Sequence, residues 1–190
     1  MAELLLFHHA QGQTAGFLAF ADELRAAGHV VHAPDLYEGK TFAELADGVS
    51  YAEQVGFDVI IQRGAAAAEG LPAEIVYAGF SLGVLPAQML TQTRPGAQGA
   101  LLLHACVPTS EFETPWPDGV PLQIHMMDED EWVKDDLVVA RDLVDKVENA
   151  ELFLYPGDGH LFADSSLGDF DQEAAALLME RVLAFLEAVE

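Results

Sequence analysis

Six short apolar runs recur along the chain, and longer segments with apolar residues spaced three or four apart separate them. Runs that are apolar at nearly every position are typical of strands buried on both faces of a parallel sheet. Strand alternating with helix favours such a sheet, because parallel neighbours need a long crossover connection that is usually helical. The predicted strands are Leu4–His9, Val30–Ala33, Ile75–Ala78, Ala100–His104, Leu122–His125 and Leu152–Tyr155.

The segments between these runs predict five helices and one long loop. Residues Val107–Gly119 contain three prolines and show no periodicity, so we expect a loop that crosses the sheet edge. No internal repeat or linker interrupts the pattern, and 190 residues suit one domain over 1–190 with a sizeable core. The helices are marked by Phe17, Ala21 and Leu24 behind a Thr14 N-cap, by Ile60, Gly64 and Ala68, by Leu85 and Met89, by Leu137, Arg141, Val144 and Val147, and by Leu178, Val182, Phe185 and Val189.

The charge balance narrows the choice of partners. The chain has 32 acidic and 8 basic residues and a net charge of −24, with the acidic residues spread along its length. Phosphate contacts need clustered Lys and Arg, so we expect no nucleic-acid partner, and the same charge disfavours an anionic membrane surface. Hydrophobic residues make up 51% of the chain, which excludes a disordered protein. The sequence does not distinguish a monomer from a homodimer.

Cysteine usage and the N-terminal residues bear on the compartment. Cys106 is the one cysteine, so the chain forms no internal disulfide and no cysteine-built metal site. The apolar run Leu4–Phe7 is too short for a signal peptide, and no basic region precedes it. No run approaches the roughly 18 apolar residues of a membrane span. These features predict a cytoplasmic protein.

A serine stands between two glycines directly after the third predicted strand, in the stretch "YAGFSLGVLPA". Ligands of open parallel sheets bind beyond the carboxyl ends of the strands, which is where Ser81 falls. Gly79 and Gly83 would let strand and helix pack closely around a sharp turn, and the N–H of Leu82 would point to where an oxyanion forms. A plain strand-to-helix turn also uses glycine often, so Gly-x-Ser-x-Gly alone leaves nucleophile and turn as alternatives.

Two later strands also run into ionisable residues. The strand Leu122–His125 leads to four consecutive acidic residues, 128–131, and the strand Leu152–Tyr155 leads to His160. A nucleophilic serine needs a base, and the base needs a carboxylate to fix its tautomer. The order serine, acid, histidine is the order of an α/β-hydrolase, although spacing alone does not choose among the four acids.

The chain resembles the dienelactone hydrolase family of the α/β-hydrolase superfamily over nearly its whole length. The resemblance implies a mostly parallel sheet of about six strands with helices on both faces and, in so short a chain, no cap domain. It selects Asp130, which one residue separates from the aromatic residue and valine of this segment, Trp132 and Val133, and it leaves Asp128 as the second candidate. The matching stretches are "HHAQG" at 8–12, "APDLY" at 33–37, "GFSLG" at 79–83, "HMMDEDEWV" at 125–133 and "YPGDGHLFAD" at 155–164.

The resemblance also implies a mechanism. Ser81 would attack an ester or lactone carbonyl while His160 takes its proton and Asp130 orients His160, giving an acyl-enzyme that water releases. The backbone N–H groups of Leu82 and of Ala10 or Gln11 would hold the oxyanion. No metal or organic cofactor is required.

The chain departs from the family at positions that bear on the substrate. The family has cysteine as nucleophile in many members, a glutamate where this chain has His9, and an arginine where it has Asp164. The family's arginines hold the carboxylate of dienelactone, so Asp164 and the acidic surface disfavour dienelactone itself and favour a small neutral ester or lactone. The side chains expected in the substrate pocket are His9, Tyr37, Trp116, Trp132, Phe162 and Asp164.

Other functions have less support in the sequence. A hydrolase fold can serve as a catalytically inactive binding protein, because fold alone does not prove catalysis. A dinucleotide-binding module is disfavoured, because "HHAQGQTAG" lacks the G-x-G-x-x-G spacing. The strand-end histidines 8, 9, 104 and 125 lack a close-spaced ligand motif, so we expect buried, hydrogen-bonded rings in place of a zinc site. Cys106 lacks a following helix and is expected to be a buried small residue.

Overall fold

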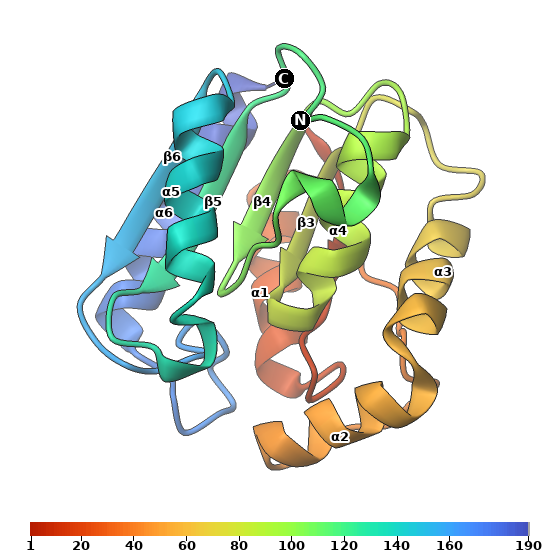
Figure 1. Ribbon diagram of the computed structural model, residues 1–190. Helices are drawn as coiled ribbons and strands as arrows, with labels where there is room; N and C mark the ends of the chain where they lie inside the picture. The colour runs from red at the N-terminus through yellow and green to blue at the C-terminus, as the bar shows by residue number, and fades with distance from the viewer. Residues whose placement is uncertain (190) are drawn as a thin grey trace.

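The six strands are β1 (Glu3–Phe7), β2 (Val30–His32), β3 (Val76–Phe80), β4 (Gly99–Leu103), β5 (Leu122–Met127) and β6 (Ala150–Tyr155). In the computed structural model, which describes residues 1–189, they form one all-parallel sheet in the order β2-β1-β3-β4-β5-β6 (Figure 1). After β1 the chain adds β2 on one side, and it then returns to the other side of β1 with β3, from which β4, β5 and β6 follow outward. The carboxyl ends of β1 and β3 therefore flank the switch point, where open α/β sheets bind ligands.

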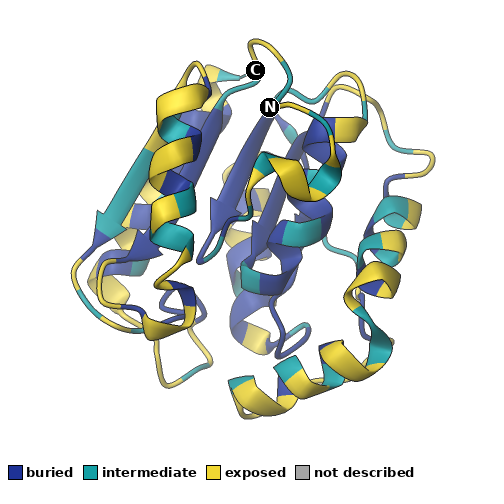
Figure 2. Ribbon diagram, viewed as in Figure 1, coloured by how far each residue is buried: buried dark blue, intermediate teal, exposed yellow. Residues whose placement is uncertain are grey.

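Helices cover both faces of the sheet, because neighbouring strand residues point to opposite sides. Leu4 and Leu6 of β1 pack in a core with α1 and α6, whereas Leu5 and Phe7 pack against α3 and α4 on the other face. The strands β1, β3, β4 and β5 are almost wholly buried, whereas the edge strands β2 and β6 are only partly buried, and the helices expose their outer sides (Figure 2). The helices are α1 (Ala15–Ala26), α2 (Leu45–Val55), α3 (Phe57–Ala67), α4 (Val84–Thr93), α5 (Asp136–Lys146) and α6 (Gln172–Ala188).

The all-parallel sheet and its two helical layers confirm the predicted fold class, with differences in detail. β1 ends at Phe7, two residues earlier than predicted, so His8 and His9 belong to the turn that follows the strand. Helix α2 was not predicted, because it buries only Gly48 and Ala52 and so lacks an apolar stripe. No helix among residues 1–189 is long and apolar enough to cross a bilayer.

The segment between β4 and β5 corrects the expected path of the loop 107–119. It joins neighbouring strands, and it lies along α4 without crossing an edge of the sheet. The α4 side chains of Gln88 and Gln92 hold it, since their amide groups donate to the carbonyl oxygens of Val107 at 2.7 Å and Thr109 at 3.0 Å. Buried glutamines that bind backbone carbonyls satisfy polar groups that this irregular loop leaves without partners.

Candidate active site

Ser81 sits in the sharp turn between β3 and α4. Its φ is +49°, in the left-handed region that non-glycine residues avoid at a cost of roughly 1–2 kcal/mol. A Cβ on Gly79 would lie 2.2 Å from the carbonyl oxygen of Gly83, and a Cβ on Gly83 would lie 2.4 Å from that of Phe7. Both glycines are therefore required by close backbone approach, and the strained serine is held where strand, turn and helix meet.

Ser81, His160 and Asp130 form a continuous hydrogen-bonded chain. Ser81 Oγ lies 2.7 Å from His160 Nε2, and His160 Nδ1 lies 2.6 Å from Asp130 Oδ2. A carboxylate only accepts hydrogen bonds, so the proton of the ring is on Nδ1 and Nε2 is free to accept from the serine hydroxyl. His160 is 4% exposed and Asp130 is 2% exposed, which shields the pair from water.

The loop after β5 separates Asp130 from its acidic neighbours. Asp130 caps the 3-10 turn Glu131–Val133, and its Oδ1 accepts from Trp132 N–H at 2.9 Å while its Oδ2 faces His160. Asp128 is exposed and accepts from the N–H of Gly157 at 3.1 Å. The cap fixes the carboxylate of Asp130 in one orientation, which spacing in the sequence does not define.

A cleft of about 200 Å³ opens at Ser81 and His160. Its walls are mostly aliphatic. They come from α2, from α4, from the first residues of the loop after β4 and from the 3-10 turn after Asp130. Asp136, at the start of α5, also lines it, and burial raises the pKa of this carboxyl while the N–H of Cys106 at 3.4 Å opposes that shift. No Lys or Arg is among the described residues that line the cleft.

The backbone N–H groups expected to hold an oxyanion come from two turns, one after β3 and one after β1. Leu82 is in the first turn of the helical segment after Ser81, where N–H groups have no intrahelical acceptor. Of the two further donors expected, Gln11 already donates its N–H to His9 Nδ1 at 3.2 Å, which leaves Ala10 as the second candidate. A Cβ on Gly48 would lie 2.1 Å from Ala10 O, so α2 packs directly on this turn.

The expected pocket residues divide into one that lines the cleft and five that lie elsewhere. Trp132 lines the cleft beside His160, with ring centroids 6.1 Å apart. Tyr37, Phe162, His9 and Asp164 are fully buried beneath the site, because the first two pack against His8 and His104 and the last two bind each other. Trp116 donates its indole N–H to Val120 O and lines a separate surface hollow. The aliphatic cleft wall from α2 was missed together with that helix.

The other strand-end histidines are buried as expected, but the expectation of hydrogen-bonded rings is wrong for His104, because neither of its ring nitrogens has a hydrogen-bond partner among the described residues. His125 contacts Tyr155 Oη at 2.8 Å, and burial lowers its pKa to about 3. His104 packs edge-on against Phe162 at 4.7 Å, and burial followed by the neighbouring His160 lowers its pKa well below its usual value. Within residues 1–189, no group of three His, Cys, Asp or Glu side chains is arranged to hold a metal ion.

Cys106 is not among the residues that line the cleft. Its thiol is buried and donates to Asp136 O at 3.4 Å. Burial raises the pKa of the thiol, so the nucleophilic thiolate is disfavoured at neutral pH.

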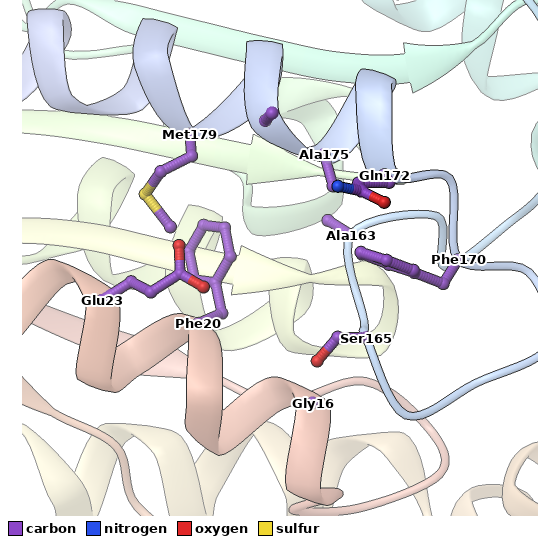
Figure 3. Close-up of a pocket in the computed structure, with 10 residues that line it drawn as sticks. Gly16, Phe20, Glu23, Ala163, Ser165, Phe170, Gln172, Ala175 and Met179 are labelled. Atoms are coloured by element: carbon purple, nitrogen blue, oxygen red, sulfur yellow. The ribbon is translucent and has the colours of Figure 1, made fainter.

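A second hollow of about 190 Å³ lies between α1, α6 and the segment 163–170 (Figure 3). Phe20, Phe170 and Met179 are among its lining residues, and neither Ser81 nor His160 reaches it. The cleft at Ser81, in contrast, contains both the serine hydroxyl with its histidine partner and apolar walls. We therefore take that cleft as the candidate active site.

The sheet order, the strained serine turn and the serine–histidine–aspartate chain define an α/β-hydrolase. The model of the dienelactone hydrolase family matches residues 3–190, and the chain belongs to that family. This confirms the family expected from the sequence motifs. No curated protein sequence matches the chain.

Solved structures show the same fold at low sequence identity. A dienelactone hydrolase-like promiscuous phosphotriesterase from metagenomic libraries is 16% identical, with a TM-score of 0.78 over 100% of this chain and 87% of that one. A dienelactone hydrolase from Anabaena variabilis is 15% identical, with a TM-score of 0.73 over 99% and 86%. Esterase 2 of Thermogutta terrifontis, solved as phosphoramylated by tabun, is 18% identical, with a TM-score of 0.64 over 99% and 83%.

Proposed function

We propose that this hydrolase-family protein is a serine hydrolase that cleaves a small carboxylic ester or lactone through an acyl-enzyme on Ser81. The observation that carries the proposal is the hydrogen-bonded chain from Ser81 Oγ through His160 to Asp130, at 2.7 Å and 2.6 Å. His160 Nε2 takes the hydroxyl proton as Ser81 Oγ attacks the carbonyl carbon. Asp130 keeps the ring in the productive tautomer and stabilises the imidazolium that forms.

The tetrahedral oxyanion is then held by the N–H groups of Leu82 and Ala10. Each such donor contributes on the order of 3 kcal/mol to stabilisation of the transition state. His160 returns its proton to the leaving alkoxide, and the acyl group stays on Ser81. In the second half, His160 activates a water that attacks the acyl carbonyl, releasing the carboxylic acid and restoring the serine.

The cleft supports a neutral substrate of modest size. Its aliphatic walls favour an apolar acyl or alcohol group, and Asp136 places a carboxyl beside the reacting groups. An anionic lactone would meet this carboxylate without a basic partner among the described lining residues. We therefore propose neutral esters or lactones, and not dienelactone, as the substrate class.

Labelling with a fluorophosphonate tests the proposal directly. The probe reacts with an activated serine, so we expect one label on the wild type, at Ser81, and none on Ser81→Ala or His160→Ala. Hydrolysis of short p-nitrophenyl esters should follow the same order. A folded wild type that takes no label and cleaves no ester would leave the inactive binding protein as the better description.

A further inference from the structure

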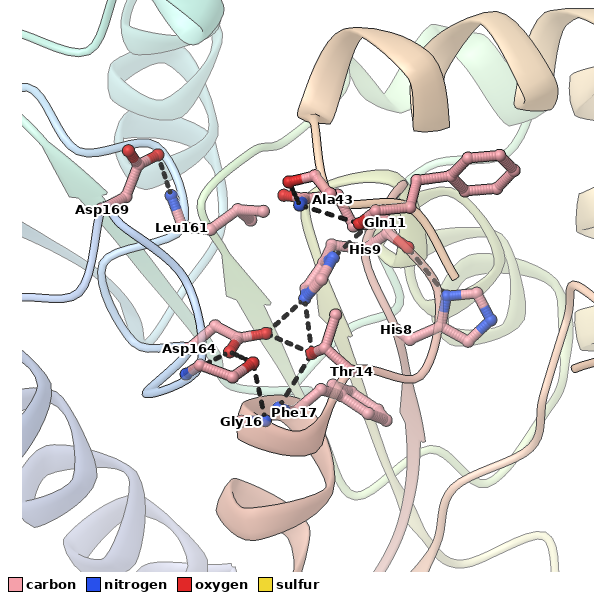
Figure 4. A network of polar contacts seen from close by, with 12 residues as sticks. His8, His9, Gln11, Thr14, Gly16, Phe17, Ala43, Leu161, Asp164 and Asp169 are labelled. Atoms are coloured by element: carbon pink, nitrogen blue, oxygen red, sulfur yellow. Dashed lines mark hydrogen bonds and ion pairs between the residues drawn. The ribbon is translucent and has the colours of Figure 1, made fainter. Parts of the chain in front are cut away.

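His9 and Asp164 form a second buried histidine–carboxylate pair, which does not line the cleft (Figure 4). His9 Nε2 lies 2.8 Å from Asp164 Oδ2, and both side chains are 0% exposed. Asp164 also accepts from the hydroxyl of Thr14 and from the N–H and hydroxyl of Ser166. Burial raises the pKa of Asp164, but these hydrogen bonds outweigh burial and lower it to about 2. Asp164 is thus an acceptor, and the proton of His9 is on Nε2.

The other nitrogen of His9 holds the turn that follows β1. His9 Nδ1 accepts the N–H of Gln11 at 3.2 Å, which requires a ring nitrogen without a proton. The two contacts therefore specify one neutral tautomer. Because each nitrogen has a different partner, His9 connects the segment after His160 with the turn that contains Ala10.

From Gln11 the network continues to the wall of the cleft. The side-chain amide of Gln11 donates to Phe42 O at 3.1 Å and to Ala43 O at 2.8 Å, directly before α2. Gln11 O accepts from the N–H of Phe42 at 3.0 Å. Helix α2 then packs on Ala10 at Gly48, where a Cβ would lie 2.1 Å from Ala10 O. The backbone of Ala10 thus lies between the ring of His9 and α2, and the carbonyl oxygen of the peptide that carries its N–H, His9 O, accepts from Gly12 N–H at 3.0 Å and lies 2.8 Å from His8 Nδ1.

We propose that His9 is a positioning residue that aims the Ala10 N–H at the oxyanion, with Asp164 setting the His9 tautomer. This inference rests on the proposed serine hydrolase function. The hydrogen bonds of His9 go to Asp164, Gln11 and, at 3.5 Å, to Thr14. His9 therefore acts through the backbone of the turn, and Ser81 relies on His160 alone as its base.

Two substitutions separate the two ring contacts. His9→Asn keeps an acceptor near the position of Nδ1 for the Gln11 N–H but does not reach Asp164. His9→Gln keeps a donor near the position of Nε2 for Asp164 but leaves the Gln11 N–H without its partner. If His9 only stabilises the core, both variants should change the unfolding midpoint and leave kcat alone.

A displaced turn after β1 should lower kcat, whereas loss of core stability alone should not. Misplacing an oxyanion donor lowers kcat, and loss of one such donor costs on the order of 100-fold or more. We expect kcat of His9→Gln to fall by at least about tenfold, with KM within about threefold of the wild type, and His9→Asn to retain more of kcat than His9→Gln. Asp164→Asn should also lower kcat, because its amide would donate to His9 Nε2 and move the ring proton to Nδ1, against Gln11.

Nitrogen-15 NMR of the His9 ring supplies a readout that needs no turnover and no variant. Protonated Nε2 and unprotonated Nδ1 support the inference, and protonated Nδ1 overturns it. In kinetics, a Ser81-dependent reaction with unchanged kcat in His9→Gln overturns the inference and leaves the proposed function intact. Absence of any Ser81-dependent reaction in the wild type overturns both.

Discussion

His160 Nδ1 lies 2.6 Å from Asp130 Oδ2, although the two residues are 30 positions apart and follow different strands. β5 and β6 are parallel neighbours, so the loops that follow them meet at the same edge of the sheet. The second oxygen of Asp130 is occupied by the N–H of Trp132, which prevents the carboxylate from rotating away. A fixed carboxylate in this place determines which ring nitrogen of His160 carries the proton.

Replacing Asp130 with Asn should lower kcat for ester hydrolysis by roughly 1,000- to 10,000-fold, because an amide no longer enforces the productive His160 tautomer. Asp128→Asn is the matched control, since Asp128 lies in the same loop and binds only the N–H of Gly157. Steady-state kinetics of both variants decide which acid serves His160. A larger loss in Asp128→Asn would show that the neighbouring aspartate is the triad acid.

Removing the charge of Asp136 should relax discrimination against anionic substrates. p-Nitrophenyl pentanoate and mono-p-nitrophenyl glutarate have acyl chains of equal length, and only the glutarate ester carries a free carboxylate. We expect Asp136→Asn to raise the glutarate-to-pentanoate ratio of kcat/KM by about tenfold at pH 8, which corresponds to about 1.4 kcal/mol of removed repulsion. Glu131→Gln removes an exposed carboxylate outside the cleft and should leave the ratio unchanged. Equal ratios in wild type and Asp136→Asn would assign selectivity to another feature.

The left-handed backbone of Ser81 should reduce stability. Both Ser81→Gly and Ser81→Ala abolish the hydroxyl and its contact with His160, so their difference isolates backbone strain. Glycine adopts φ near +49° without a Cβ clash, and Ser81→Gly should therefore be about 1 kcal/mol more stable than Ser81→Ala. Urea unfolding of the two variants measures this directly. Equal midpoints would mean that the turn carries no strain that depends on the Cβ.

Two buried histidines should make the fold sensitive to mild acid. Burial lowers the pKa of His8 to about 4 and that of His125 to about 3, from 6.5 in the unfolded chain. Between these values and 6.5 the unfolded chain binds more protons, so stability is present above pH 6.5 and is lost as the pH falls. From pH 8 to pH 5, each ring should lower the free energy of unfolding by about 2 kcal/mol.

Urea unfolding at pH 8 and pH 5 measures this loss. The net charge of −24 changes over the same range, so the wild type alone does not isolate the histidines. His125→Gln removes one titrating ring and keeps groups that can bind Tyr155 and Gln123. Its loss of stability between the two pH values should be about 2 kcal/mol smaller than that of the wild type. An identical loss would contradict the assignment for His125.

The sheet and its strands followed from local pattern, because buried parallel strands are apolar at nearly every position. The sharp turn after β3 could likewise be predicted from Gly79-x-Ser81-x-Gly83. Neighbouring backbone atoms lie so close to both glycines that no Cβ fits there. The family expected from the motifs was confirmed by the match over residues 3–190. Helix α2 escaped prediction because its burial is limited to Gly48 and Ala52, which leave no apolar stripe in the sequence.

The sequence by itself determined the succession of strands along the chain, the serine turn and the set of side chains available at the strand ends. Tertiary structure decided how those side chains pair, because parallel strands bring together loops that are distant in the chain. Asp130 meets His160 because β5 adjoins β6, and His9 meets Asp164 across 155 positions of sequence. His9 and Asp164 were expected in the pocket because they stand where the resembled family has a glutamate and an arginine. They lie beneath it because each satisfies the buried hydrogen-bonding group of the other, and only the folded chain brings the two within reach.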